Sequence, residues 1–98
     1  MIKVKVKTDT YIHSLEISGH AGGINGSDIV CAGVSAVVIG GFNELLRNNN
    51  KLIHIIREGY AYVELNNNQE LQIITKTILT QLETIQESYQ KKVKIQRI

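Results

Sequence analysis

The N-terminal end of the chain alternates between apolar and polar residues, and this pattern predicts a pair of β-strands. Residues 2 to 7, IKVKVK, alternate strictly, which is typical of a strand with one buried face. The TDT at residues 8 to 10 has the composition of a turn. A second alternation follows at Tyr11, His13, Leu15 and Ile17. We therefore expect a hairpin, and after it a glycine-rich loop.

The middle of the chain changes to a helical pattern. From Asp28 to about Arg47 the residues are apolar on nearly every side of a helix, so we expect this helix to be central in the fold. The NNN at residues 48 to 50 ends it. Small residues recur at every fourth position and form a stripe that another element, or a second copy of the chain, can approach closely: Ala32, Ala36 and Gly40.

The second half of the chain repeats the order of two strands and a helix. Residues 52–56 and 60–65 have strand composition, and Glu58 and Gly59 predict a tight turn in which glycine supplies a positive φ. Asn67 is the expected N-cap of the second helix, with Glu70 three residues later completing a capping box. That helix has one apolar stripe at intervals of three and four: Leu71, Ile74, Ile78, Leu82, Ile85 and Tyr89.

The C-terminal KKVKIQRI alternates again and predicts a final strand. The element order is therefore ββαββαβ, an α+β fold with a mainly antiparallel sheet and two helices. With 98 residues the chain has the size of one domain, and we expect residues 1–98 to form it.

Composition and charge narrow the class of protein. Hydrophobic residues are 43% of the chain and charged residues 20%, which is typical of a globular domain. The net charge of +2 is too weak to indicate nucleic acid by itself. The simplest interpretation of the alternating lysines is the solvent-exposed face of a strand, and the alternative is a basic face that binds RNA: Lys3, Lys5 and Lys7.

Nothing in the sequence calls for an oxidising compartment or a membrane. A lone cysteine, Cys31, cannot form an internal disulfide. The start of the chain lacks the layout of a signal peptide. No uninterrupted apolar run approaches the roughly 20 residues that cross a bilayer. We expect a cytoplasmic protein with no membrane partner.

Candidate chemistry lies in residues 18 to 36, SGHAGGINGSDIVCAGVSA. If Asp28 caps the helix (Ser27 is the alternative), Cys31 falls in its first turn, where backbone N–H groups and the helix dipole stabilise a thiolate. His20, across the loop, can act as the base or as a cationic partner of the thiolate. The same N–H groups would face an oxyanion formed by attack of the sulfur on a carbonyl. This combination predicts a cysteine hydrolase.

Simpler explanations stay open for each of these residues. Cys31 can be a small buried hydrophobe, and Asp28 can cap the helix without orienting His20. Ser35, one turn after Cys31, can reach the site or bond back to a carbonyl of the preceding turn. A zinc site using His20, Asp28 and Cys31 lacks paired-ligand spacing, so we expect no metal.

The glycines between the histidine and the cysteine also have two interpretations. Gly22, Gly23 and Gly26 lower the cost of unusual backbone angles and of close approach by another chain. A flexible loop of this kind predicts a lid that closes over an extended peptide and brings His20 toward Cys31. The alternative is a flexible connection with no role in binding.

The two motifs SGHAG and DIVCAGVSA together resemble the ribosomal-processing cysteine protease family, often called Prp. Chain length and element order are also similar, so the resemblance covers essentially the whole chain. It implies that His20 and Cys31 are a catalytic dyad, with Asp28 and Ser35 as supporting site residues. The loop GGINGS departs from relatives that carry aromatic or charged residues there, which bears on substrate contacts made by the loop.

The resemblance also implies a substrate and an assembly. Members of the family remove a short N-terminal extension from the large-subunit ribosomal protein numbered twenty-seven. They cut after an aromatic residue within an apolar motif, and they are homodimers. We therefore predict a cysteine endopeptidase that acts on this extension and needs no cofactor. The alternatives are a non-catalytic ribosome-associated or RNA-binding module and a redox-sensing thiol domain.

Overall fold

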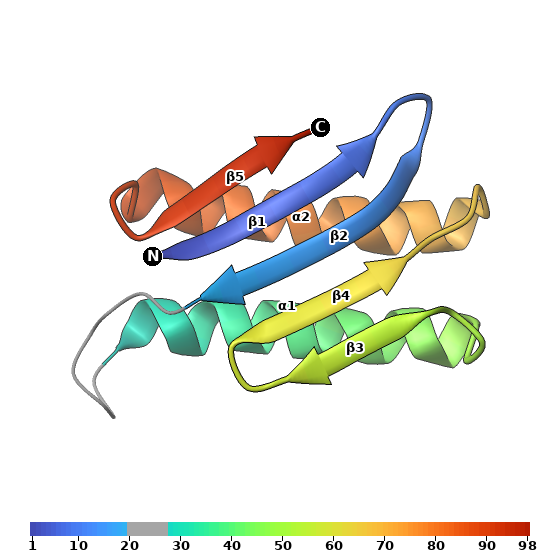
Figure 1. Ribbon diagram of the computed structural model, residues 1–98, viewed down its shortest axis with the longest axis horizontal. Helices are drawn as coiled ribbons and strands as arrows, with labels where there is room; N and C mark the ends of the chain where they lie inside the picture. Colours follow the sequence, from blue (N-terminus) through green and yellow to red (C-terminus); the bar gives the residue numbers. More distant parts are fainter. Residues whose placement is uncertain (20–27) are drawn as a thin grey trace.

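The computed structural model describes residues 1–19 and 28–98, and its elements follow the expected order (Figure 1). Within these residues the elements are β1 (Ile2–Thr8), β2 (Ile12–Gly19), α1 (Ile29–Asn48), β3 (His54–Arg57), β4 (Tyr60–Glu64), α2 (Gln69–Ser88) and β5 (Val93–Arg97). The predicted ββαββαβ order is confirmed.

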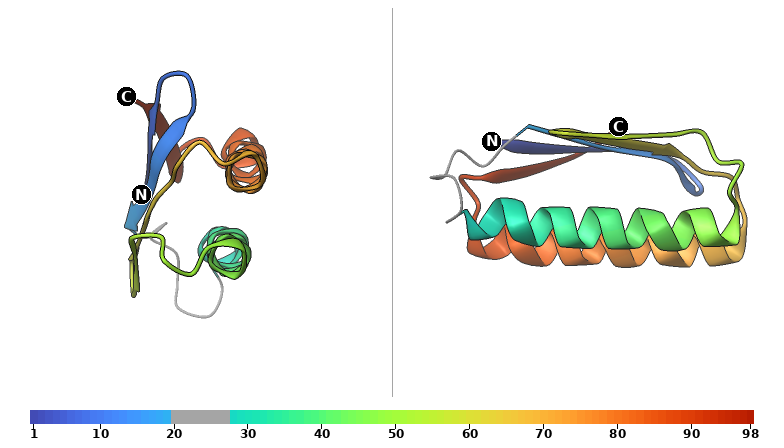
Figure 2. Two further views of the ribbon diagram at one scale, coloured as in Figure 1. Left: turned by 90° about the vertical axis from the view of Figure 1, so that its right-hand side faces the viewer. Right: turned by 90° about the horizontal axis from the view of Figure 1, so that it is seen from below.

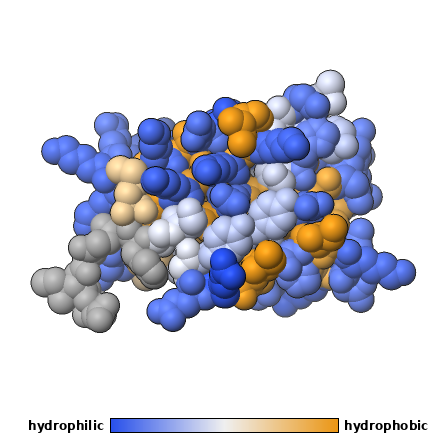
Figure 3. All heavy atoms as spheres, viewed as in Figure 1, coloured by the Kyte–Doolittle hydropathy of each residue, from blue (hydrophilic) through white to orange (hydrophobic). Residues whose placement is uncertain are grey.

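The strands form one sheet in the order β3-β4-β2-β1-β5. Neighbouring strands are antiparallel except for β5, which runs parallel to β1. Both helices lie side by side on one face of this sheet, so the molecule has two layers (Figure 2). The other face carries no helix and is mostly hydrophilic (Figure 3). The predicted α+β class with a mainly antiparallel sheet is therefore confirmed.

The hairpin of β1 and β2 forms as expected, with one irregularity. Along β1, Ile2, Val4 and Val6 are buried while the lysines between them are exposed. The pairing of β1 with β2 shifts register after Lys7. As a result Ile12 is buried together with residues 15 and 17. The sequence pattern had assigned Tyr11 and His13 to this buried face, and both assignments were wrong.

The first helix is not central, contrary to its composition. α1 buries one stripe against the sheet and α2: Val30, Val34, Val38, Phe42 and Leu45. The predicted small-residue stripe at positions 32, 36 and 40 is exposed instead. The close approach to α2 occurs at Gly41, where an added Cβ would collide with the side chain of Ile78.

The length and composition of α1 correct one premise of the expectation about membranes, that no segment is long and apolar enough to cross a bilayer. Among the described residues, this is one helix long and apolar enough to cross a bilayer on those two criteria. Glycine and serine interrupt the apolar run of this helix but lower its mean hydropathy little. A criterion based on uninterrupted apolar residues therefore does not detect the helix. Core helices and signal sequences meet the same criteria. In this structure the buried stripe of α1 packs against the sheet.

The second helix follows its pattern closely. Leu71, Ile78 and Leu82 of the predicted stripe are buried, and Ile74, Ile85 and Tyr89 pack against the core. The cap lies one residue later than expected, because the side chain of Asn68, not Asn67, accepts the N–H of Leu71 at 3.0 Å. A run of three asparagines offers several equivalent caps, so local composition does not select among them.

Candidate active site

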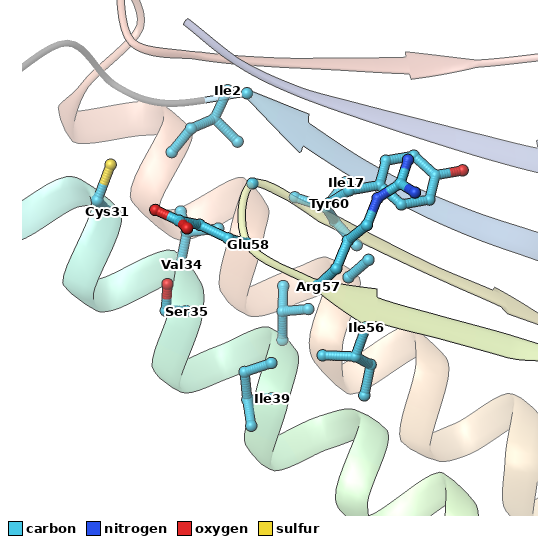
Figure 4. A pocket seen from close by; sticks show the side chains of 14 residues that line it. Ile2, Ile17, Cys31, Val34, Ser35, Ile39, Ile56, Arg57, Glu58 and Tyr60 are labelled. Atoms are coloured by element: carbon cyan, nitrogen blue, oxygen red, sulfur yellow. The ribbon is translucent and has the colours of Figure 1, made fainter.

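A cavity of about 500 Å³ opens between the N-terminal half of α1 and the edge of the sheet formed by β2, β4 and β3. Figure 4 shows Cys31, Ser35 and Ile39 along its α1 side and the β3–β4 hairpin opposite. Most of its wall is apolar: Ile2, Ile17, Val34, Val38, Ile39, Ile56 and Ala61. A cavity of this size and lining suits an apolar side chain of a ligand, since ligand sites commonly span about 300–1,000 Å³.

Asp28 caps α1, as predicted. Its Oδ1 accepts the backbone N–H groups of Val30 and Cys31, each at 3.1 Å. The cap places Cys31 at the third helical position, inside the first turn, where the positive end of the helix dipole favours an anion.

The same contacts change one expectation. The N–H groups of Val30 and Cys31 were expected to face an oxyanion, but they donate to the Asp28 carboxylate. The N–H of Ala32 donates to the Asp28 carbonyl oxygen. The first turn therefore holds the cap and orients the thiol, and the N–H groups of Val30 and Cys31 are committed to the cap.

Cys31 is half-buried at the wall of the cavity and packs against the core. Its side chain packs against the core while lining the cavity (Figure 4), and its role as a nucleophile stays a prediction. A thiol in this setting can meet a substrate carbonyl, which a fully buried cysteine cannot.

Ser35 lies one turn after Cys31 and lines the same cavity. Threonine hydroxyls in α2 bond back to the carbonyl four residues earlier, as at Thr75 and Thr77. Within the described chain no such bond is found for Ser35, and its side chain is exposed to the cavity. Its position favours a role in contacting a ligand.

The remaining predicted site residues lie outside the described residues. These are His20 and the loop glycines Gly22, Gly23 and Gly26. The structure brings together Cys31 and Ser35, with Asp28 adjoining them at the helix start. The lid and the dyad stay predictions.

Gly19 forms the cavity wall where β2 ends. Its φ of +94° and its contact with the N-terminus both require glycine, because a Cβ would collide with the carbonyl oxygen of Met1. Its N–H donates to the carbonyl of Gly59 at 3.0 Å, which ties the end of β2 to the β3–β4 turn. The backbone beside the cavity is held in place by this bond.

The hairpin contributes residues that sequence patterns did not indicate. Arg57, Glu58 and Tyr60 line the cavity although they are distant from Cys31 in sequence. The hydrogen bond from the Tyr60 hydroxyl to Glu16, 2.8 Å long, raises the pKa of Tyr60 above its usual value. No local signal marks these positions, since only the pairing of β4 with β2 brings them to α1.

Other histidines serve local contacts. The Nε2 of His13 lies 2.7 Å from Oδ1 of Asp9, and this bond lowers the pKa of Asp9. The Nδ1 of His54 contacts the carbonyl oxygen of Leu52 at 2.8 Å. Across residues 1–19 and 28–98, no group of three or more histidine, cysteine or acidic side chains is placed to hold a metal ion.

The chain is similar to known proteins over almost its whole length. The family model described as "Cysteine protease Prp" matches residues 1–94. The chain belongs to the Prp family. It is therefore a cysteine protease, of the group concerned with ribosomal processing.

Individual Prp proteins match over nearly the whole chain. The Ribosomal processing cysteine protease Prp of Staphylococcus aureus is 31% identical, covering 96% of this chain and 94% of its own. That of Bacillus subtilis is 34% identical, covering 89% and 87%.

Solved structures of Prp also match in fold. The crystal structure of Prp from S. aureus with a covalently linked product peptide has a TM-score of 0.86, at 31% identity, over 100% of both chains. A second S. aureus Prp structure, with a substrate peptide, has the same TM-score at 28% identity and the same coverage.

Proposed function

We propose that this protein is an endopeptidase that removes the short N-terminal extension of the large-subunit ribosomal protein numbered twenty-seven, cutting after an aromatic residue. The observation that carries the proposal is the half-buried thiol of Cys31, held in the first turn of α1 and opening on an apolar cavity. The S. aureus structures of Prp with a substrate peptide and with a covalently linked product peptide support a peptide as the ligand.

In the proposed reaction the thiolate of Cys31 is the nucleophile. Its sulfur bonds to the carbonyl carbon before the scissile bond and forms a tetrahedral oxyanion. When this collapses, the C–N bond breaks and the amine leaves with a proton from His20. Water then attacks the thioester, releasing the new carboxylate and returning the thiol.

The cavity supports the proposed preference for a large apolar residue before the cut. Its walls are formed by isoleucine and valine side chains from both layers, including Val34, Ile39 and Ile56. Removing an aromatic side chain from water against such walls is worth a few kcal/mol, about 1.5–3 for a fully buried Phe. In the proposed complex Ser35, which lines the same cavity, would hydrogen-bond the peptide backbone.

Cleavage of a synthetic peptide with the apolar-aromatic motif tests the proposal. We expect the wild type to cut it once, with no cleavage by Cys31→Ala and a loss of about 10²–10⁴-fold in kcat/KM for His20→Ala. His54→Ala is the matched control, because that exposed imidazole lies outside the cavity lining and its variant should cut normally. An intact peptide with wild-type protein, or cleavage by Cys31→Ala, would overturn the proposal.

The RNA-binding alternative has one structural observation in its favour. Lys3, Lys5 and Lys7 are exposed along β1 on the helix-free face of the sheet, and Lys94 of β5 pairs with Lys3. Salt-sensitive RNA binding by the wild type, lost when these lysines are replaced, would make this face an RNA-binding surface of the protease.

The homodimer implied by the resemblance stays a prediction. The exposed side of α1 offers one surface for it, since Ala32, Ala36 and Gly40 all lie there beside the exposed Ile39. Small residues at this spacing let two helices approach closely.

A further inference from the structure

The two charged residues at the turn of the β3–β4 hairpin, Arg57 and Glu58, point in different directions (Figure 4). Arg57 pairs with Tyr60 across the hairpin, and Gly59, with φ of +72°, closes the turn after Glu58. The guanidinium of Arg57 lies 4.8 Å from the ring centroid of Tyr60. Glu58 points instead toward α1, with its carboxylate on the side of the cavity where Cys31 and Ser35 lie (Figure 4).

Glu58 is thus the one carboxylate among the described residues that line this cavity. Of the described residues that line it, Glu58 and Arg57 are the charged ones, and the arginine is engaged by the Tyr60 ring. The ion pairs in the described part of the chain join His13 to Asp9, Arg47 to Glu44 and Arg97 to Glu83, so Glu58 forms none there. A carboxylate at the mouth of an otherwise apolar cavity favours a cationic group on whatever binds beside it.

We propose that Glu58 is a specificity-determining residue that selects peptides with a lysine or arginine flanking the apolar residue held in the cavity. This inference rests on the proposed function, because it concerns the peptide bound for cleavage at Cys31. The cavity takes the apolar side chain, and the Glu58 carboxylate meets the ammonium or guanidinium of a neighbouring residue. The backbone of the turn that carries Glu58 is tied to the end of β2, since the Gly19 N–H donates to the carbonyl of Gly59.

The size of the preference for a lysine or arginine peptide depends on how exposed the Glu58 carboxylate is to solvent. Glu58 is exposed to solvent, so its attraction for a cation is that of a surface ion pair and not of a buried one. We expect about a three- to fivefold advantage in kcat/KM for the lysine peptide over its neutral counterpart. The advantage should shrink as ionic strength rises, because solvent-exposed charges are screened by salt.

A set of peptides separates this inference from the proposed function. Starting from the apolar-aromatic peptide with uncharged flanks, lysine, norleucine or glutamate is placed in turn at each of the two positions that flank the aromatic residue. Wild type should favour lysine at one of these positions. Glu58→Gln should cut the lysine and norleucine peptides equally, and Glu58→Lys should favour the glutamate peptide at the same position.

Glu44→Gln is the matched control, because it makes the same change of charge on an exposed residue of α1. It lies 13 positions beyond Cys31, about 20 Å along the helix, and should keep the wild-type preference. If wild type cuts every peptide at one rate, or if Glu58→Gln slows all of them equally at an unchanged Tm, the inference is wrong while the protease stands. If wild type cuts none, the proposed function itself fails, and the inference with it.

Discussion

Replacing Asp28 by alanine removes the cap of the helix that carries the nucleophile. The Oδ1 of Asp28 accepts two N–H groups, those of Val30 and Cys31, and alanine leaves both to water. Asparagine keeps an acceptor oxygen at the same place and removes the charge. The pair of variants therefore separates the hydrogen bonds of the cap from the attraction of the carboxylate to the helix dipole.

The loss in the free energy of unfolding should be about three times larger for Asp28→Ala than for Asp28→Asn. Loss of an N-cap acceptor costs about 1 kcal/mol, and loss of the charge beside the dipole costs about 0.5 kcal/mol. Of these two contributions alanine loses both, about 1.5 kcal/mol, while asparagine loses the second. For a domain of this size 1 kcal/mol shifts Tm by about 4–8 °C, so Asp28→Ala should lower Tm by about 6–12 °C and Asp28→Asn by about 2–4 °C.

Calorimetry at neutral pH measures both shifts, and peptide cleavage at a temperature where each variant is folded adds a second measurement. Equal destabilisation by the two substitutions, or none by alanine, would refute the assignment of the cap. If Asp28→Asn keeps its Tm but loses cleavage, the carboxylate charge acts in the reaction as well as at the helix start.

Two further predictions concern packing and pH. Gly41→Ala should lower Tm, because the added methyl group meets Ile78 in the core and this outweighs the better helix propensity of alanine. Gly40→Ala has open space around the added methyl group and should raise the free energy of unfolding by up to about 1 kcal/mol. A rise in Tm for both variants would contradict the close contact at Gly41. The hydrogen bond to Glu64 raises the pKa of Tyr62 to about 12 from its ordinary 10.0, so its contribution to stability is fully present below pH 10 and is lost as pH rises toward 12. Urea unfolding should show wild type losing more stability than Tyr62→Phe over this interval, and parallel losses would contradict the effect of the bond.

Several features of the molecule were accessible from local sequence. The alternation from Ile2 to Lys7 identifies a strand with one buried face, and Asp28 identifies the start of α1 to the residue. The intervals of three and four from Leu71 identify the buried stripe of α2. Each depends only on backbone geometry and on residues within one or two turns, so periodicity and capping chemistry suffice to predict it.

The hairpin side of the cavity depended on contacts across the fold. Arg57 and Glu58 lie in a turn that composition identifies correctly, but their place beside Cys31 arises because β4 pairs with β2 and α1 packs below that pair. The helix itself shows the same limit. Its apolar residues are too numerous to reveal which face is buried, and the expected stripe at Ala32 is exposed while Gly41 meets α2.

The sequence alone determined the order of the elements, the position of the thiol in the first turn of a helix, and the family to which its motifs point. The tertiary structure decided what lies across the cavity from that thiol: apolar side chains of the sheet and the carboxylate of Glu58. The physical reason is the distance along the chain over which the interacting residues are separated. Hydrogen bonds of a cap and the spacing of a stripe are set by neighbours along the chain, whereas the walls of a cavity are set by strand pairing and helix packing between segments far apart in sequence.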